Sequence, residues 1–279
     1  MNTLHLSHLT SLAITAAIAA GEKVNEIYNG EYTTTYKTDQ SPLTTADIKA
    51  HETILNFLKE TDIPVLSEEG RNINWEERRK WHYFWLVDPL DGTKEFINRN
   101  GEFTINIALV AGQSPVMGVI YVPVTGMLYF GNSEIGAWSA DMSISQQIHD
   151  FKSLALLLEK CNRLPLQVNN PTITILASRS HLSPETREII EKIQGKYPDC
   201  QITNAGSSLK FCRMAEGNAQ YYPRFGPTME WDTAAGHAIA ALAGINIKSW
   251  PDLLPLEYNK ENLVNPWFIA IKEGLPEIS

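Results

Sequence analysis

The sequence predicts a mixed α/β (α+β) fold built in two halves, and three patterns carry that prediction. An amphipathic helix opens the chain, closely spaced apolar runs over residues 103–138 indicate an antiparallel meander, and strands alternate with helices after about residue 150. A chain of 279 residues is long enough for about two domains of ~150 residues. We therefore expect an N-terminal half over residues 1–150 and a C-terminal half over 151–279.

The first predicted helix covers residues 4–28, where apolar side chains recur at helical spacing and Asn29-Gly30 follows as a cap. Its run of small apolar residues from Ser11 to Ala20 is similar to the core of a secretory signal, but no Lys or Arg precedes that run. We therefore expect a core helix rather than a leader. No apolar run reaches the ~18 residues of a transmembrane helix, so none is predicted.

The rest of the N-terminal half reads as short strands around one further helix. Residues 33–36 are β-prone, a helix is expected from Thr44-Thr45 to about Lys59, and residues 64–66 form a short buried strand. The charged stretch 72–80 is expected as a surface excursion. Residues 83–87 form a buried strand that stops at Asp88, and a tight turn and a helix start follow. The meander strands are then expected over residues 105–110, 116–122, 127–130 and 136–138.

The C-terminal half alternates between strands and helices. Strands are expected over residues 173–177 and 219–222, and helices over 184–194, 207–216 and 231–243. Gly217 and Gly244 follow the last two helices, where glycine commonly ends a helix.

Composition limits the classes of function. The apolar fraction is 43%, the charged fraction is 20% and the net charge is −9, which are values of a globular chain. An acidic chain without a basic stripe is a poor binder of nucleic-acid polymers. The three cysteines, Cys161, Cys200 and Cys212, include no CxxC pair. We expect them to be free thiols in a reducing cytoplasm, not a disulfide framework or a zinc site.

The informative feature is where the acidic residues fall. Glu68 and Glu69 follow one buried strand, Asp88 and Asp91 flank the turn after another, and Asp232 opens a helix. Carboxylates at strand ends and helix starts can converge in one cleft, and oxygen ligands favour Mg²⁺ or Mn²⁺ over zinc. The alternatives are ordinary turn chemistry or a calcium loop for the Asp-x-x-Asp-Gly segment, and helix capping for Asp232.

The hexapeptide Asp88-Pro-Leu-Asp-Gly-Thr93 combines two kinds of ligand. Its carboxylates can share metal ions, the Leu90 carbonyl can add a ligand, and Gly92 lets the backbone approach closely. Thr93 starts a helix whose free N–H groups suit an anion. Metal ions and phosphate-binding amides at one turn are the parts that phosphoryl hydrolysis needs.

Together these motifs resemble a known family. Glu68-Glu69, Asp88-Pro-Leu-Asp-Gly-Thr93 and Trp231-Asp232-Thr-Ala-Ala-Gly236 are similar to the metal motifs of the inositol monophosphatase superfamily, in the same order and over nearly the whole chain. Further segments resemble bacterial CysQ-type 3′(2′),5′-bisphosphate nucleotidases: residues 37–47, 66–69, Ala177-Ser-Arg-Ser-His181, Gly206-Ser-Ser-Leu-Lys210 and 221–227.

The resemblance implies a fold, a cofactor and a substrate. The fold would be the layered α/β/α/β/α sandwich of sugar phosphatases, and the cofactor two or three Mg²⁺ ions, with Mn²⁺ as a substitute. Glu68, Asp88, the Leu90 carbonyl, Asp91 and Asp232 would hold the metal. The substrate would be adenosine 3′,5′-bisphosphate, cleaved to AMP and phosphate. The residues expected to contact it are Glu68, Leu90, Asp91, Gly92, Thr93, His181, Ser207, Lys210, Arg224 and Asp232.

We hypothesise direct in-line attack by a metal-activated water, with Asp47 and Thr93 as the catalytic pair that orients the water or takes its proton. His181, Ser207, Lys210 and Arg224 are candidates for the 5′-phosphate, and Arg179 is a further one. Each also has a plain structural interpretation: Lys210 as a surface helix residue, Arg224 as a loop ion-pair partner and His181 as a helix cap.

Two other functions stay open at this point. One is hydrolysis of inositol monophosphate, which needs no second anion site; the other is a non-catalytic metal- or phosphate-binding regulatory protein. We further expect a monomer in the cytoplasm, with the resemblance also implying peripheral association with the inner face of the inner membrane. The sequence leaves the number of metals, the adenine contacts and the physiological role open, whether sulfate assimilation or nucleotide detoxification.

Overall fold

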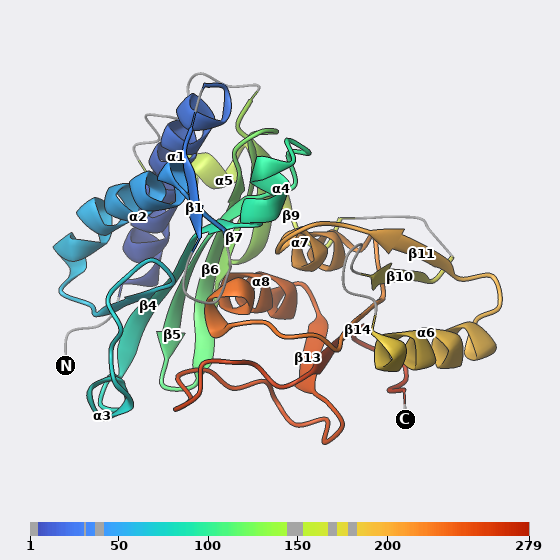
Figure 1. Cartoon of the computed structure of the whole chain (residues 1–279). Helices are drawn as coiled ribbons and strands as arrows, with labels where there is room; N and C mark the ends of the chain where they lie inside the picture. The colour runs from blue at the N-terminus through green and yellow to red at the C-terminus, as the bar shows by residue number, and fades with distance from the viewer. Residues whose placement is uncertain are drawn as a thin grey trace.

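Helices and sheets of this protein alternate in layers. The computed structural model describes residues 5–30, 32–36, 42–143, 153–166, 172–177 and 183–278. Helices α1 (Leu6–Tyr28) and α2 (Thr45–Leu58) pack on each other and cover one face of a seven-stranded sheet (Figure 1). Helices α7 (Leu209–Glu216) and α8 (Glu230–Leu242) lie between this sheet and a five-stranded sheet, whose outer face is covered by α6 (Pro184–Lys196). The predicted α/β/α/β/α arrangement is confirmed.

The seven-stranded sheet contains the predicted meander. Its strand order is β3-β4-β5-β6-β7-β8-β9, with β3 and β4 parallel and all later neighbours antiparallel. The strands are β3 (Val65–Ser67), β4 (Tyr83–Asp91), β5 (Thr104–Ala111), β6 (Ser114–Val122), β7 (Met127–Asn132), β8 (Gly136–Asp141) and β9 (Asn162–Arg163).

The five-stranded sheet has the order β11-β10-β12-β14-β13, in which β10 is parallel to both neighbours and β14 is antiparallel to β12 and β13. Its strands are β10 (Thr174–Ala177), β11 (Gln201–Asn204), β12 (Tyr221–Arg224), β13 (Ile245–Ser249) and β14 (Phe268–Lys272). A separate pair joins β1 (Thr34–Tyr36) to β2 (Pro42–Thr44). The short helices are α3 (Trp75–Arg78), α4 (Thr93–Ile97), α5 (Leu154–Leu158) and the 3-10 turn Lys59–Thr61.

Both faces of the seven-stranded sheet are buried, which explains why β4 reads as a continuous apolar run. Trp85 and Val87 point toward α1 and α2, whereas Phe84 and Leu86 point toward the core that contains α8. A strand with one face in water would have alternated apolar and polar residues instead. Helix α8, which belongs to the predicted C-terminal half, therefore completes the core of the N-terminal sheet.

Two glycines allow α8 to lie close to its neighbours. A Cβ on Gly118 of β6 would lie 2.3 Å from the carbonyl oxygen of Ala235, and one on Gly236 would lie 2.5 Å from the Phe211 ring of α7. Either contact is closer than atoms can approach without the backbone or ring shifting. Helix α8 thus fits between the sheet and α7 because glycine stands at both contact points, Gly118 toward the sheet and Gly236 toward α7.

The structure corrects two expectations about local structure. Strand β4 does not stop at Asp88 but continues to Asp91. The charged stretch 72–80 is not only a surface excursion, because the Arg78 side chain is buried and donates to Asn259 Oδ1 and to the carbonyls of Ile73, Lys260 and Glu261.

The division at residue 150 stays a prediction: α5 and β9 lie beyond it in the chain, and β9 pairs with β8 of the N-terminal sheet. All three cysteines are unpaired. None of the helices in the described ranges is long and apolar enough to span a bilayer.

Candidate active site

The acidic residues singled out in the sequence meet at one edge of the seven-stranded sheet. Strands β3 and β4 are parallel and end together, and the Glu68 N–H extends their ladder by donating to the Val87 carbonyl at 3.1 Å. Glu68 therefore comes next to Asp88 at the carboxyl ends of neighbouring strands. Asp232 reaches the same place from the first turn of α8.

A bulge in β4 brings Asp88 and Asp91 to the same face. Asp88 pairs with Asn106 of β5 and Asp91 with Thr104, so three steps along β4 oppose two along β5. In a regular strand, residues three apart point to opposite faces, and the bulge absorbs the extra residue. Pro89 lies inside the bulge, where its missing N–H costs no ladder bond.

The carboxylates repel one another, and burial adds to the effect. Burial is the largest cause of the pKa of Asp88 lying well above its usual range, followed by the charges of Glu68, Asp91 and Asp232. Burial, then the charge of Asp91, likewise raises the pKa of Asp232. The pKa of Asp91 is raised by burial, although hydrogen bonds oppose the shift. Lys210 and Arg224 offset only part of this negative charge, and a divalent cation would offset more of it.

The donor set fits a hard cation, although its side chains are held by the protein itself. Asp88 Oδ1 accepts the Leu90 N–H at 3.1 Å, and Asp232 Oδ2 accepts the Met229 N–H at 2.9 Å, so Asp232 also caps α8. No group of three or more His, Cys, Asp or Glu side chains is already arranged around one metal position within the described ranges. The chemistry of the set, all oxygen with excess negative charge, matches Mg²⁺.

Asp47 and Thr93 lie in contact beside the carboxylates. Thr93 Oγ1 donates to Asp47 Oδ1 at 3.1 Å and also lies 3.4 Å from the Leu90 carbonyl oxygen. Thr44 is the N-cap of α2 and Asp47 is the third residue of the helix. The other carboxylate oxygen of Asp47 accepts hydrogen bonds from the Thr44 N–H at 2.7 Å and from the Thr44 hydroxyl at 2.6 Å. Burial raises the pKa of Asp47, so its carboxylate is a stronger base than an exposed one.

Gly92 shapes the entry to α4. Its φ of 95° is left-handed, and a Cβ would lie 3.3 Å from the Glu102 carbonyl oxygen, so only glycine fits without strain. Thr93 follows as the first residue of the helix.

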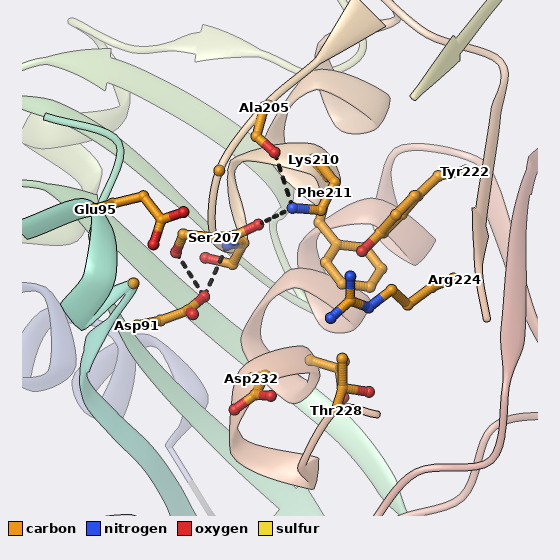
Figure 2. A pocket seen from close by; sticks show the side chains of 14 residues that line it. Asp91, Glu95, Ala205, Ser207, Lys210, Phe211, Tyr222, Arg224, Thr228 and Asp232 are labelled. Atoms are coloured by element: carbon orange, nitrogen blue, oxygen red, sulfur yellow. Dashed lines mark hydrogen bonds between the residues drawn. The ribbon is translucent and has the colours of Figure 1, made fainter. Parts of the chain in front are cut away.

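A pocket adjoins this carboxylate cluster, and cationic side chains lie on its other side (Figure 2). Asp91, Gly92 and Asp232 line one part of the pocket. The other part is lined by Ser207 from the turn before α7, Lys210 from α7 and Arg224 from β12. Glu95, Tyr222 and Thr228 also line the pocket and were not predicted. The signal for Glu95 was weak, because a carboxylate in a first helical turn is ordinary.

Lys210 is buried, with 6% of its surface exposed, so its interpretation as a surface helix residue is wrong. Its Nζ donates to the carbonyls of Ala205 at 3.0 Å and Ser207 at 2.8 Å. Burial lowers the pKa of Lys210 to about 8, with Asp91 raising it and Arg224 lowering it further. Two cationic side chains close enough to affect each other's charge can both donate to one phosphate.

The structure thus brings together Asp47, Glu68, Asp88, Leu90, Asp91, Gly92, Thr93, Ser207, Lys210, Arg224 and Asp232. The remaining candidates, Arg179 and His181, lie outside the described residues. Oxygen ligands next to cationic side chains suit a divalent cation and a phosphate ester.

Comparison with known proteins gives the family. Residues 5–258 match the inositol monophosphatase family. Proteins named 3′(2′),5′-bisphosphate nucleotidase CysQ are 46% identical in Salmonella typhimurium LT2 and 44% identical in Escherichia coli K12, over 254 residues that cover 89% of this chain and 94% of each relative. This chain belongs to the inositol monophosphatase family.

Solved structures agree with that assignment. CysQ from Bacteroides thetaiotaomicron, titled a bacterial member of the inositol monophosphatase family, superposes with a TM-score of 0.90 at 48% identity, covering 98% of this chain and 100% of that one. The extragenic suppressor protein suhB of Bartonella henselae, at 22% identity and a TM-score of 0.71, shares the fold.

Proposed function

We propose that this chain is a Mg²⁺-dependent phosphatase that hydrolyses the 3′-phosphate of adenosine 3′,5′-bisphosphate to give AMP and phosphate. The observation that carries the proposal is the pair of cations Lys210 and Arg224 across one pocket from the carboxylates Asp91 and Asp232. A substrate with two phosphates needs an anion site separate from the reacting centre. The CysQ relatives, named for bisphosphate nucleotidase activity, support the same substrate class.

Glu68 and Asp88 would hold one Mg²⁺ ion, and Asp88, Asp91 and Asp232 a second, with the Leu90 carbonyl as an additional ligand. A third ion and substitution by Mn²⁺ belong to the same proposal. When bound, Mg²⁺ lowers the pKa of a water ligand and neutralises phosphate charge, which prepares in-line attack.

The protein's own residues orient the reaction. Thr93 and Asp47 form a chain from the reacting centre to a buried carboxylate, along which the proton of the attacking water can pass. The N–H groups of Gly92 and Thr93 at the start of α4 would hold the phosphate that is cleaved. Ser207, Lys210 and Arg224, joined by His181, would bind the 5′-phosphate.

The substrate proposal has a direct test. Phosphate release in Mg²⁺ would be compared for adenosine 3′,5′-bisphosphate, inositol 1-phosphate and 5′-AMP, with the Asp88→Asn protein beside the wild type. We expect strong preference for the bisphosphate and a loss of at least about a hundredfold in the variant, because metal charge stabilises the transition state by several kcal/mol. Equal or faster hydrolysis of inositol 1-phosphate would contradict the roles of Lys210 and Arg224. No hydrolysis of any substrate would favour a regulatory binding protein.

We further propose a cytoplasmic protein, which the three unpaired thiols support, and a monomer, which the resemblance to its subfamily suggests. The resemblance to CysQ-type enzymes also suggests peripheral association with the inner face of the inner membrane, and we include this association in the proposal.

A further inference from the structure

The turn before α7 is held in an unusual conformation by the opposite half of the chain. Ser207 has a φ of 49°, a left-handed conformation that a non-glycine residue keeps only when its surroundings fix it. The neighbouring Gly206 N–H donates to Glu102 Oε2 at 2.9 Å, and a Cβ on Gly206 would lie 2.9 Å from the Glu102 carbonyl oxygen. Contacts from Glu102, just before β5 in the chain, therefore help to determine the shape of this turn.

A network of hydroxyl groups completes the attachment, and Thr104 of β5 is at its centre. Thr104 Oγ1 lies 2.7 Å from Ser207 Oγ and 2.7 Å from Ser208 Oγ. Ser207 Oγ donates to Asp91 Oδ2 at 2.6 Å, and the Ser208 N–H donates to the same oxygen at 2.8 Å. Asn106 Oδ1 lies 3.0 Å from Thr104 Oγ1 and 2.8 Å from Ser208 Oγ.

Counting protons gives Thr104 a defined place in this network. A hydroxyl has one proton to donate, and the Ser207 proton goes to the Asp91 carboxylate, its shortest and charged partner. Ser207 Oγ can then only accept at its contact with Thr104. The Thr104 and Ser208 protons are shared among Ser207 Oγ, Asn106 Oδ1 and the contact between these two hydroxyls, so Thr104 links the Ser207-Ser208 turn to Asn106 of β5. Thr104 is fully buried, so water cannot take over its role.

The same turn places the ammonium group of Lys210. Two of its backbone carbonyls, those of Ala205 and Ser207, accept from Lys210 Nζ (Figure 2). A change in the backbone at Ser207 would therefore move the cation that faces the pocket.

We propose that Thr104 is a positioning residue for recognition of the second phosphate: its hydroxyl fixes the Ser207-Ser208 turn, and the turn fixes Lys210. This inference rests on the function proposed above, in which Lys210 binds the 5′-phosphate. Thr104 itself makes no contact with the substrate in this proposal and acts only through the turn.

The test uses Thr104→Val, which removes the hydroxyl at nearly constant volume, and Thr104→Ser, which keeps it. For each protein, kcat/KM in saturating Mg²⁺ is measured for adenosine 3′,5′-bisphosphate and for 3′-AMP, which lacks the 5′-phosphate. Calorimetric titration gives the Kd of 5′-AMP, and the Mg²⁺ concentration for half-maximal 3′-AMP hydrolysis reports on Asp91. Melting temperatures identify any general loss of structure.

We expect Thr104→Val to lower the preference for the bisphosphate roughly tenfold and to weaken 5′-AMP binding by a similar factor, because a buried partner is lost. Thr104→Ser should restore both values. The proposal would be overturned if Thr104→Val kept the wild-type preference for the bisphosphate over 3′-AMP, with or without a raised Mg²⁺ requirement. It would also be overturned if Thr104→Ser lost as much of that preference as Thr104→Val.

Two further results separate this inference from other failures. If Thr104→Val does not fold, Ser208→Ala opens the same network with a small loss of volume, and we expect the same loss of preference; an unchanged preference there overturns the proposal. A wild-type protein with no preference for the bisphosphate over 3′-AMP would instead contradict the proposed function, and this inference with it.

Discussion

Single residues set the charge balance of the candidate site, and Lys210 shows how. A lysine on the surface would be fully charged at neutral pH, whereas burial lowers the pKa of Lys210 to about 8. Its ammonium is kept in place by backbone carbonyls that bear no full charge. The group therefore stays available to an anion but loses its charge in mildly alkaline solution.

This pKa predicts a pH-dependent substrate preference. Below about pH 8 the Lys210 amine is protonated and attracts the 5′-phosphate, and above it the charge is lost. The ratio of kcat/KM for the bisphosphate to that for 3′-AMP should therefore fall roughly tenfold from pH 7 to pH 9, as the protonated fraction does. Lys210→Met is the control, with a low ratio that does not change with pH. A wild-type ratio that is constant or rises over this range would exclude Lys210 as the titrating contact.

At the scale of elements, the fit of α8 against its neighbours decides where Asp232 lies. The helix starts two residues before Asp232 and crosses β6 at Gly118 with no room for a side chain. Any outward shift of α8 would carry Asp232 away from the end of β4. The proposed metal site thus depends on a glycine in another strand that has no chemistry of its own.

Gly118→Ala tests this dependence. Its Cβ would meet the Ala235 carbonyl oxygen, so we expect a loss of about 1–3 kcal/mol in the free energy of unfolding together with reduced activity. Gly195→Ala is a matched control, because Gly195 lies in α6 with open space around its Cβ position and alanine favours helix there. Urea unfolding and phosphate release check both variants. Equal stability of the two would show that α8 can shift without cost.

At the scale of the whole molecule, the site lies where the two predicted halves of the chain meet. Asp88 and Asp91 lie in β4 of the seven-stranded sheet, and Glu68 directly follows β3. Asp232, Lys210 and Arg224 come from helices and a strand of the C-terminal half. Their carboxylates repel one another across this junction. Cation binding should therefore stabilise the protein as a whole.

Metal removal gives the corresponding prediction. Mg²⁺ at a hundred times its Kd stabilises the folded state by about 2.7 kcal/mol, which raises the melting temperature by roughly 5–10 °C over the value in EDTA. Asp88→Asn should melt no lower than wild type in EDTA, since it removes one repelled charge, and should gain less from Mg²⁺. Scanning calorimetry measures the four melting temperatures, those of the wild type and of Asp88→Asn in EDTA and in Mg²⁺. An equal Mg²⁺ gain in both proteins would contradict Asp88 as a ligand.

Most of the fold could be predicted from local sequence. The opening helix, the meander and the last helix follow from strong periodicity or from glycine and asparagine at their ends. Strand β11 could not, because its residues Gln201–Asn204 are all exposed and carry no apolar alternation. Arg78 was misjudged because a charged stretch gives no sign that a distant loop will bury one of its members.

The sequence by itself determined the type of chemistry, because the residues able to bind a metal and a phosphate occur in short motifs that can be read in order. Only the tertiary structure decided which of them meet. The bulge that turns Asp91 to the side of Asp88 depends on pairing with β5, and the burial of Lys210 depends on packing of α7 between two sheets. Network positions such as Thr104 were not predicted either, since a hydroxyl in an apolar strand acquires its role from serines about a hundred residues away. Contacts between distant segments fix geometry and charge, and no local pattern encodes them.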